Sequence, residues 1–180
     1  MLVIGLVGEK GSGKGEFVKI FKRLHPKTNI EVVSGSGILS TTLNLWRLPN
    51  SRKNLQKLAQ LMEDFGNGTL ANAVEFQIKQ SSAEITILDS VRWEVDERVV
   101  RQFLPNILVA IKCSPTLRYQ RSIKRNEKYQ ESDLSFSKFM EEENSVNETY
   151  KANICQRADI TIDNNLNLES LAKQIQNIKF

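Results

Sequence analysis

The chain reads Gly8-Glu9-Lys10-Gly11-Ser12-Gly13-Lys14 directly after an apolar run over residues 2–7, and apolar residues recur at helical spacing from Phe17 to Leu24. A nearly continuous apolar run is typical of a parallel strand buried on both faces. The stretch fits the pattern G-x-x-x-x-G-K, whose glycines let the backbone curl so that successive N–H groups surround phosphate oxygens. The helix that follows adds the positive end of its dipole. A plain glycine-rich turn is the alternative, but Lys14 in this context favours a loop that holds the phosphates of a nucleoside triphosphate.

Strands and helices alternate along the rest of the sequence. Apolar runs predict strands at 2–7, 30–33, 85–89, 107–111 and 160–162, and helical spacing predicts helices at 17–24, 55–65, 70–78, 95–103, 115–128, 136–150 and 168–178. This alternation indicates an α/β fold around a parallel sheet. We therefore expect a three-layer P-loop NTPase fold with a five-stranded parallel sheet, formed by a single domain over residues 1–180.

Composition excludes several other classes of protein. The 180 residues carry a formal net charge of +4 and include two cysteines and one histidine. Cys113 and Cys155 stand far apart, which disfavours a disulfide framework and, with a lone histidine, a zinc site. The mild basic charge, without a run of Lys or Arg, disfavours nucleic acid as a partner. The first apolar run is too short to span a membrane, so we expect a cytoplasmic protein that does not contact a membrane.

The residues after Lys14 depart from the common form of the motif. Gly15 and Glu16 stand where a Ser or Thr would ligate Mg²⁺. Asp89 ends the strand at 85–89, and a carboxylate at the end of a neighbouring parallel strand faces the phosphate loop. We therefore expect Asp89 to hold the metal. The alternative is that Asp89 caps the helix that starts near Trp93.

The chain resembles the nucleoside-monophosphate kinases, a family of P-loop phosphotransferases, in several segments. Residues 8–15 resemble the adenylate-kinase form of the loop, which also has Gly after the Lys. Residues 88–92 resemble the family's strand-end Asp followed by an Arg, and 121–125 resemble its lid-entry R-x-x-x-R. Residues 158–164 are similar to the last strand and base-side loop of dephospho-CoA kinases and phage-type deoxynucleotide kinases, and 52–66 to the acceptor-binding helices of the latter.

This resemblance implies an ATP-dependent kinase that uses Mg²⁺ and acts on a small, nucleotide-like acceptor. It implies acceptor-binding helices at about 34–80 and a helical lid at about 118–150. The residues expected at the site are as follows: Gly8, Glu9, Lys10, Gly11, Ser12, Gly13, Lys14, Gly15, Glu16, Arg121 and Asn164 for the donor; Ser36, Arg52 and Arg92 for the acceptor; Asp89 for the metal; and Lys14, Asp89, Arg121 and Arg125 for catalysis.

Three arginines of the predicted lid share one helix face. Arg118, Arg121 and Arg125 are spaced i, i+3 and i+7, so they project to the same side. A face that neutralises a transferring phosphoryl group and a merely solvated basic face both fit this spacing. Arg98 and Arg101 are expected to be ordinary surface residues.

Some questions stay open at this level. Ser34-Gly35-Ser36-Gly37 fits an acceptor site and a simple helix N-cap equally well. Trp46 and Trp93 are expected in the core or in the acceptor pocket. Besides a nucleoside-monophosphate kinase, the residues allow a P-loop ATP-binding or ATPase protein with little kinase activity, and a dephospho-CoA kinase-like enzyme. The acceptor, the preferred donor and the oligomeric state leave no readable pattern in the sequence.

Overall fold

The computed structural model describes residues 1–66, 68–125, 135–143 and 146–179, apart from the side chains of 52, 125, 142–143 and 146–150. Its elements follow one another as β1 (Leu2–Val7), α1 (Lys14–Leu24), β2 (Ile30–Val33), α2 (Gly35–Leu45), α3 (Arg52–Asp64), α4 (Thr69–Gln80), β3 (Ile85–Asp89), α5 (Glu94–Arg101), β4 (Asn106–Lys112), α6 (Pro115–Arg125), α7 (Phe136–Glu143), α8 (Val146–Gln156), β5 (Ile160–Asp163) and α9 (Leu168–Gln176).

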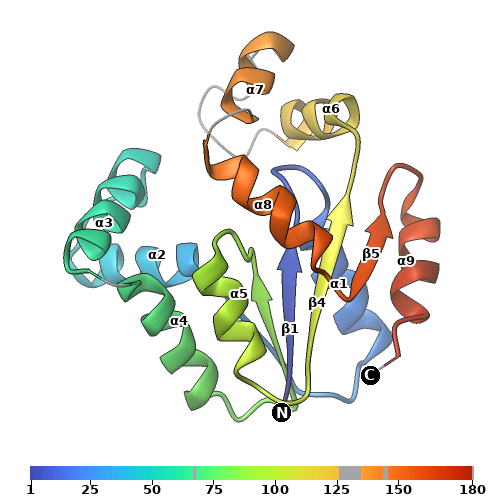
Figure 1. Ribbon diagram of the computed structural model, residues 1–180, viewed down its shortest axis with the longest axis horizontal. Coiled ribbons are helices and arrows are strands. Elements are labelled where there is room, and N and C mark those ends of the chain that lie inside the picture. The colour runs from blue at the N-terminus through green and yellow to red at the C-terminus, as the bar shows by residue number, and fades with distance from the viewer. Residues whose placement is uncertain (67, 126–134, 144–145, 180) are drawn as a thin grey trace.

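The five strands form one parallel sheet in the order β2-β3-β1-β4-β5. Strand β1 is central, and its carboxyl end leads directly into the glycine-rich loop (Figure 1). In the register of the sheet Leu6 pairs with Asp89 of β3, and Val7 pairs with Ala110 of β4. The five-stranded parallel sheet predicted from the alternation of apolar runs is therefore confirmed, and the carboxyl ends of β1 and β3 meet at one edge.

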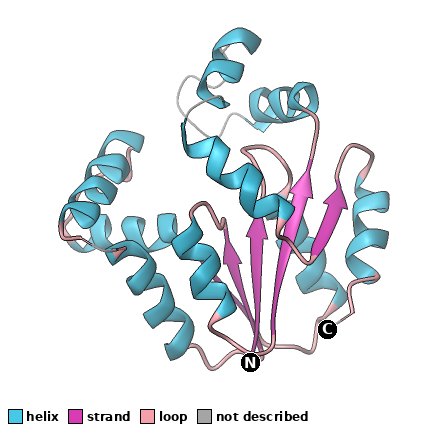
Figure 2. Ribbon diagram, in the orientation of Figure 1, coloured by secondary structure: helices cyan, strands magenta, loops and turns pink. Residues whose placement is uncertain are grey.

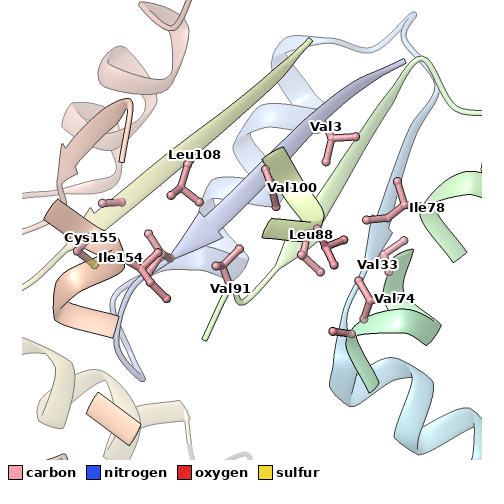
Figure 3. Close-up of a cluster of buried hydrophobic side chains, with 14 residues drawn as sticks. Val3, Val33, Val74, Ile78, Leu88, Val91, Val100, Leu108, Ile154 and Cys155 are labelled. Atoms are coloured by element: carbon pink, nitrogen blue, oxygen red, sulfur yellow. The ribbon is translucent and has the colours of Figure 1, made fainter. Parts of the chain in front are cut away.

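Helices cover both faces of this sheet, as Figure 2 shows. Because side chains alternate along a strand, Ile4 and Leu6 of β1 face α1 and α9, where Phe17 and Leu171 are fully buried. Val3 and Val7 face the opposite side. There they join the apolar cluster of Figure 3, whose other members include Val33, Val74, Ile78, Leu88, Val91, Val100, Leu108, Ile154 and Cys155. The three-layer arrangement is therefore confirmed.

Helices α2 and α3 lie beside this body, at the β2 side of the sheet (Figure 1). They pack on each other and on α4 through a small cluster of their own, in which Leu39, Leu43 and Leu58 are buried. Trp46, at the end of α2, is 55% exposed, and Trp93 is 39% exposed. The expectation that these tryptophans belong to the core is therefore wrong, and the alternative place in the acceptor pocket stays a prediction.

Two further expectations differ from the structure. The apolar spacing over 136–150 predicts one helix, whereas the structure has α7 and α8, and α8 continues to Gln156. Arg101 is more than an ordinary surface residue, since its guanidinium pairs with Asp159 at 2.7 Å and donates to Asn106. This pair ties α5 to the chain just before β5. Among the described residues no helix is long and apolar enough to cross a membrane.

Candidate phosphate-binding and transfer site

The glycine-rich loop turns between β1 and α1 in a conformation that requires its glycines. Gly11 and Gly13 have φ angles of +79° and +106°, in the left-handed region that residues with a Cβ rarely adopt. A Cβ on Gly13 would lie 2.1 Å from Nδ2 of Asn164, and one on Gly11 would lie 2.9 Å from the carbonyl oxygen of Arg118. The loop is therefore fixed both by its own backbone and by close neighbours from two other segments.

Lys14, the first residue of α1, reaches back over the loop. Its Nζ donates to the carbonyl oxygens of Gly8 at 2.8 Å and of Glu9 at 3.1 Å. The pKa of the Lys14 ammonium is lowered to about 8, mainly by burial and also by the positive charges of Lys151 and Arg92, against the opposing effect of Asp89. The ammonium is thus held inside the loop at a place where a bound phosphate would stabilise its charge.

We expect the affinity for ATP to fall as the pH rises above about 8. The free protein releases the Lys14 proton near that pH, whereas a bound triphosphate favours the charged ammonium, so binding above pH 8 must take up a proton. By linkage the dissociation constant rises by up to about tenfold for each further pH unit. Isothermal titration calorimetry between pH 7.5 and 9.5 measures this. Lys14→Met should bind more weakly but with little pH dependence; an equal slope in both proteins would contradict the assignment.

The loop is supported by side chains from the two segments on its outer side. Asn164, just after β5, donates from Nδ2 to the carbonyl oxygen of Ser12 at 2.7 Å. Arg118 of α6 donates from Nε to the carbonyl oxygen of Cys113 at 3.1 Å and from Nη1 to that of Lys10 at 3.3 Å. Arg118 is only 5% exposed, and its guanidinium lies 5.6 Å from the ring centroid of Phe139. A solvated basic face does not describe Arg118, which fixes the loop against α6.

Arg121 lies one turn further along α6 and faces the same region. Its Nη2 donates to the carbonyl oxygen of Asn164 at 3.0 Å, and its Nη1 lies 3.2 Å from Sγ of Cys113. A cavity of about 590 Å³ adjoins these groups, lined by Gly13, Glu16, Arg121, Asn164 and residues 166–169. Its position beside the loop and Arg121 of α6 gives room for the nucleoside of a bound nucleotide. Arg121 and Asn164, both expected at the donor, are thus brought together.

Asp89 lies at the end of β3, beside the strand that leads into the loop. Its Oδ1 is buried and has no hydrogen-bond partner among the described residues. The cap of α5 is supplied by Asp96 instead, whose Oδ2 accepts from the backbone N–H groups of Arg92 and Trp93. The alternative role of Asp89 as a helix cap is therefore excluded. A buried carboxylate oxygen without a partner is a costly arrangement, and a hydrated Mg²⁺ ion is the kind of ligand that would satisfy it.

Glu16 forms an ion pair within its own helix. Its side chain pairs with Lys19 at 2.7 Å on the exposed side of α1. Nothing lies within 4 Å of the position that a Cβ on Gly15 would occupy. Within the described ranges, no group of three or more His, Cys, Asp and Glu side chains could enclose a metal ion. A metal at this site would therefore take Asp89 together with phosphate oxygens and water.

The structure brings together fewer of the residues that were predicted to bind the acceptor. Ser34 caps α2, accepting from the N–H of Gly37 at 3.0 Å, and Ser36 Oγ lies 3.4 Å from Ser34 Oγ. The N-cap interpretation of this segment is thus confirmed. Arg92 is exposed near the loop and donates from Nε to Ser90 Oγ at 3.0 Å. The side chains of Arg52 and Arg125 lie outside the described part of the structure.

Some features of the site have no signal in the sequence. Helical spacing places Arg118 on one face with Arg121, but its inward direction depends on how α6 lies against the loop. Lys151 comes from α8, a helix 137 positions beyond Lys14 in the sequence, and its charge acts on the Lys14 ammonium. Ser90 has a φ of +85°, a left-handed conformation that costs a residue with a Cβ about 1–2 kcal/mol. Only the three-dimensional arrangement reveals these residues.

Comparison with solved structures defines the class of fold. A shikimate kinase from Bacteroides thetaiotaomicron superposes with a TM-score of 0.64 over 97% of this chain and 94% of that chain, at 11% identity. A gluconokinase from Sinorhizobium meliloti 1021 gives a TM-score of 0.54 over 97% and 87% of the two chains, at 11% identity. The fold is that of the P-loop kinases. The narrower likeness to nucleoside-monophosphate kinases stays a hypothesis.

Sequence comparison identifies relatives over the whole length of the chain. A UPF0200 protein of Methanoregula boonei is 28% identical over 180 residues, which covers 99% of this chain and 96% of the relative. Another UPF0200 protein, MJ1399 of Methanocaldococcus jannaschii, is 27% identical and covers 99% of this chain and 89% of the relative. No family model matches the sequence. The chain is thus similar to UPF0200 proteins, whose name specifies no activity.

Proposed function

We propose that the protein is an ATP-dependent kinase that transfers a phosphoryl group to the phosphate of a small, nucleotide-like acceptor. The observation that carries this proposal is that two charged groups occur at the same edge of the sheet. Lys14 is held in the phosphate loop, and Asp89, at the end of the neighbouring strand β3, has a buried Oδ1 without a hydrogen-bond partner among the described residues. Together they offer a cation for the outer phosphates and a carboxylate for a metal. The P-loop kinase fold and the cavity beside Arg121 support the same reading.

The residues would divide the work of the reaction by position. The loop amides and Lys14 hold the triphosphate, and Arg121 lies on the donor side of the cavity. Arg92 faces the acceptor, whose phosphate oxygen attacks the γ-phosphorus while the bond from that phosphorus to the β–γ bridging oxygen breaks and ADP leaves. Because an ionised phosphate oxygen carries no proton, no protein base is required. Mg²⁺ held near Asp89 would neutralise charge on the phosphates. Catalysis of this kind consists of positioning and electrostatic stabilisation.

A coupled assay of ADP formation tests the proposal. ATP and Mg²⁺ are supplied with a panel of ribo- and deoxyribonucleoside monophosphates, and separate reactions contain dephospho-CoA, shikimate or gluconate. The proposal expects ADP release that depends on one of the nucleoside monophosphates and a matching phosphorylated product by mass spectrometry. Phosphorylation of shikimate or gluconate alone would replace the proposed acceptor class, and dephospho-CoA would assign the dephospho-CoA kinase-like alternative.

A nucleotide-binding protein or ATPase with little kinase activity is the second candidate. The absence of a hydroxyl after Lys14 favours it, because Gly15 and Glu16 supply no direct metal ligand and Glu16 is engaged with Lys19. This candidate expects ATP to raise the thermal midpoint of the protein, with ADP release that is the same with and without any acceptor. The same coupled assay therefore separates the two functions.

We expect Arg92→Ala and Arg121→Ala to affect different kinetic constants. Arg92 lies on the acceptor side, so its loss should raise the KM of the acceptor by about 10–100-fold, the worth of charge-assisted hydrogen bonds to a phosphate. Arg121 lies on the donor side, and contacts that strengthen in the transition state appear in kcat. Its loss should therefore lower kcat more than it raises the acceptor KM. Steady-state kinetics with the acceptor varied at saturating ATP measures both.

The exposed Arg98 of α5 provides a matched control, since Arg98→Ala removes the same group away from the site. It should leave both constants within about twofold of the parental values. If Arg92→Ala and Arg121→Ala only lowered the thermal midpoint, without this division between KM and kcat, the assignment of the two arginines to acceptor and donor would be wrong.

A further inference from the structure

Ser90 occupies a strained position between the metal-side carboxylate and the acceptor-side arginine. Its φ of +85° lies in the left-handed region, where glycine would be accommodated without cost and serine is not. A strained non-glycine residue persists where its surroundings over-determine it, and such residues cluster at functional sites. The side chain of Ser90 is therefore the feature that needs an explanation.

The backbone around Ser90 is held on both sides. Val91 is buried, and its N–H donates to the carbonyl oxygen of Leu6 in β1 at 2.8 Å. The N–H groups of Arg92 and Trp93 both donate to Asp96 Oδ2, at 2.8 and 3.0 Å. The turn at Ser90 thus joins β3 to a segment anchored on β1 and on the first turn of α5. The backbone alone would be served equally well by glycine.

What serine adds, within the described part of the chain, is a hydrogen bond of its hydroxyl. Ser90 Oγ accepts a hydrogen bond from Nε of Arg92 at 3.0 Å. Arg92 is otherwise an exposed, long side chain, and such a side chain loses up to about 2 kcal/mol of rotamer entropy when it is ordered. Arg92 also lies close enough to Lys14 for its charge to act on that ammonium. The contact therefore holds the guanidinium on the side of the phosphate loop before any ligand binds.

We propose that Ser90 is a positioning residue, whose hydroxyl orients the Arg92 guanidinium for the acceptor phosphate at the expense of backbone strain. This inference rests on the proposed kinase function for the identity of the ligand. According to this inference, the site prefers a phosphate-bearing acceptor because the Arg92 side chain is already ordered before the acceptor binds. A pre-ordered side chain binds more tightly because less freedom is lost on binding.

Three substitutions separate the hydroxyl from the strain. Ser90→Gly relieves the strain and removes the hydroxyl, so the thermal midpoint should rise by about 2–4 °C while the acceptor KM rises about fivefold. Ser90→Ala removes the hydroxyl without adding the flexibility of glycine, and should raise KM by the same factor. Ser90→Thr keeps the hydroxyl on a β-branched residue, which tolerates positive φ poorly; its midpoint should fall while KM stays within about twofold of the parental value.

The experiment measures the acceptor KM at saturating ATP and the thermal midpoint for all four proteins, using the nucleoside monophosphate that the parental protein phosphorylates fastest. A KM that follows the hydroxyl, high in the Gly and Ala variants and near parental in the Thr variant, supports the inference. A KM that follows the midpoint instead, or does not change, overturns it, and the proposed function stands because the parental protein is active.

A second readout does not require activity. Hydrogen exchange of the Arg92 Nε–H with water, followed by ¹H–¹⁵N NMR, should be slow in the parental protein and the Thr variant and faster in the Gly and Ala variants. If the parental protein phosphorylates no acceptor, the proposed function fails and this exchange pattern still decides whether Ser90 orders Arg92. Equal exchange in all four proteins overturns the positioning role.

Discussion

Lys14→Ala is expected to lower kcat/KM for ATP-dependent phosphotransfer by at least about 10²–10³-fold, the effect of losing one pre-placed group that stabilises transition-state charge. The Lys14 ammonium already lies inside the glycine-rich loop, bonded to the carbonyl oxygens of Gly8 and Glu9. When ATP binds, we expect the ammonium to exchange these neutral acceptors for phosphate oxygens, which bear negative charge. Steady-state kinetics, together with calorimetric measurement of ATP binding, records the change.

The fold should survive this substitution. Burial lowers the pKa of Lys14 to about 8, which means that the folded protein holds the charged ammonium at a cost, so removing it does not destabilise the protein. The thermal midpoint without nucleotide should be equal to or above the parental value. Lys14→Arg keeps the charge but changes its shape, and should retain part of the ATP affinity with little turnover. Parental turnover in Lys14→Ala would contradict the phosphate-loop assignment.

The order of the strands and of most helices was predictable because its signals are local, although α2 was not among the predicted helices. Each buried strand is a continuous apolar run, and the glycine-rich loop has a residue pattern that its geometry demands at Gly11 and Gly13. By contrast, the separate helices α7 and α8 were predicted as one, since apolar residues keep helical spacing from 136 to 150 and periodicity does not show where one helix ends and another begins. Local signals therefore specify most elements and their order, but not every boundary between consecutive helices.

The site was predictable to the extent that single residues announce their chemistry. Asp89 was singled out from its place at a strand end, and its role as a metal ligand stays a prediction. The spacing of Arg118 and Arg121 shows only that they share a face of α6. Arg118 faces the loop and Phe139, and this depends on the packing of three separate segments. The strain at Ser90 is invisible in sequence because serine has no preference for positive φ. The identity of the acceptor could not be predicted from the sequence for the same reason, since the shape of a pocket is a property of the folded chain.

Substitution of Asp89, the proposed metal ligand, is expected to give the second large effect, because Asp89 pairs in register with Leu6 of β1, the strand that leads into the loop. Asp89→Asn is expected to lower Mg²⁺-dependent turnover by about 10–100-fold and to raise the Mg²⁺ concentration needed for half-maximal activity. An amide has nearly the same shape but lacks the charge that attracts a hydrated cation. Because Oδ1 is buried without a partner, removal of the charge should leave the thermal midpoint unchanged or raise it.

Glu16→Thr tests the same assignment from the opposite direction. Glu16 turns outward to Lys19, so replacing it removes a negative charge near the triphosphate and supplies a hydroxyl in the first turn of α1. Turnover should be preserved or improved, and less Mg²⁺ should be needed. Turnover is measured against Mg²⁺ concentration for both variants, with the exposed Asp64→Asn of α3 as a matched control that should behave as the parental protein. If Glu16→Thr lost activity while Asp89→Asn remained nearly normal, the metal would belong to Glu16 and the roles of the two carboxylates would be reversed.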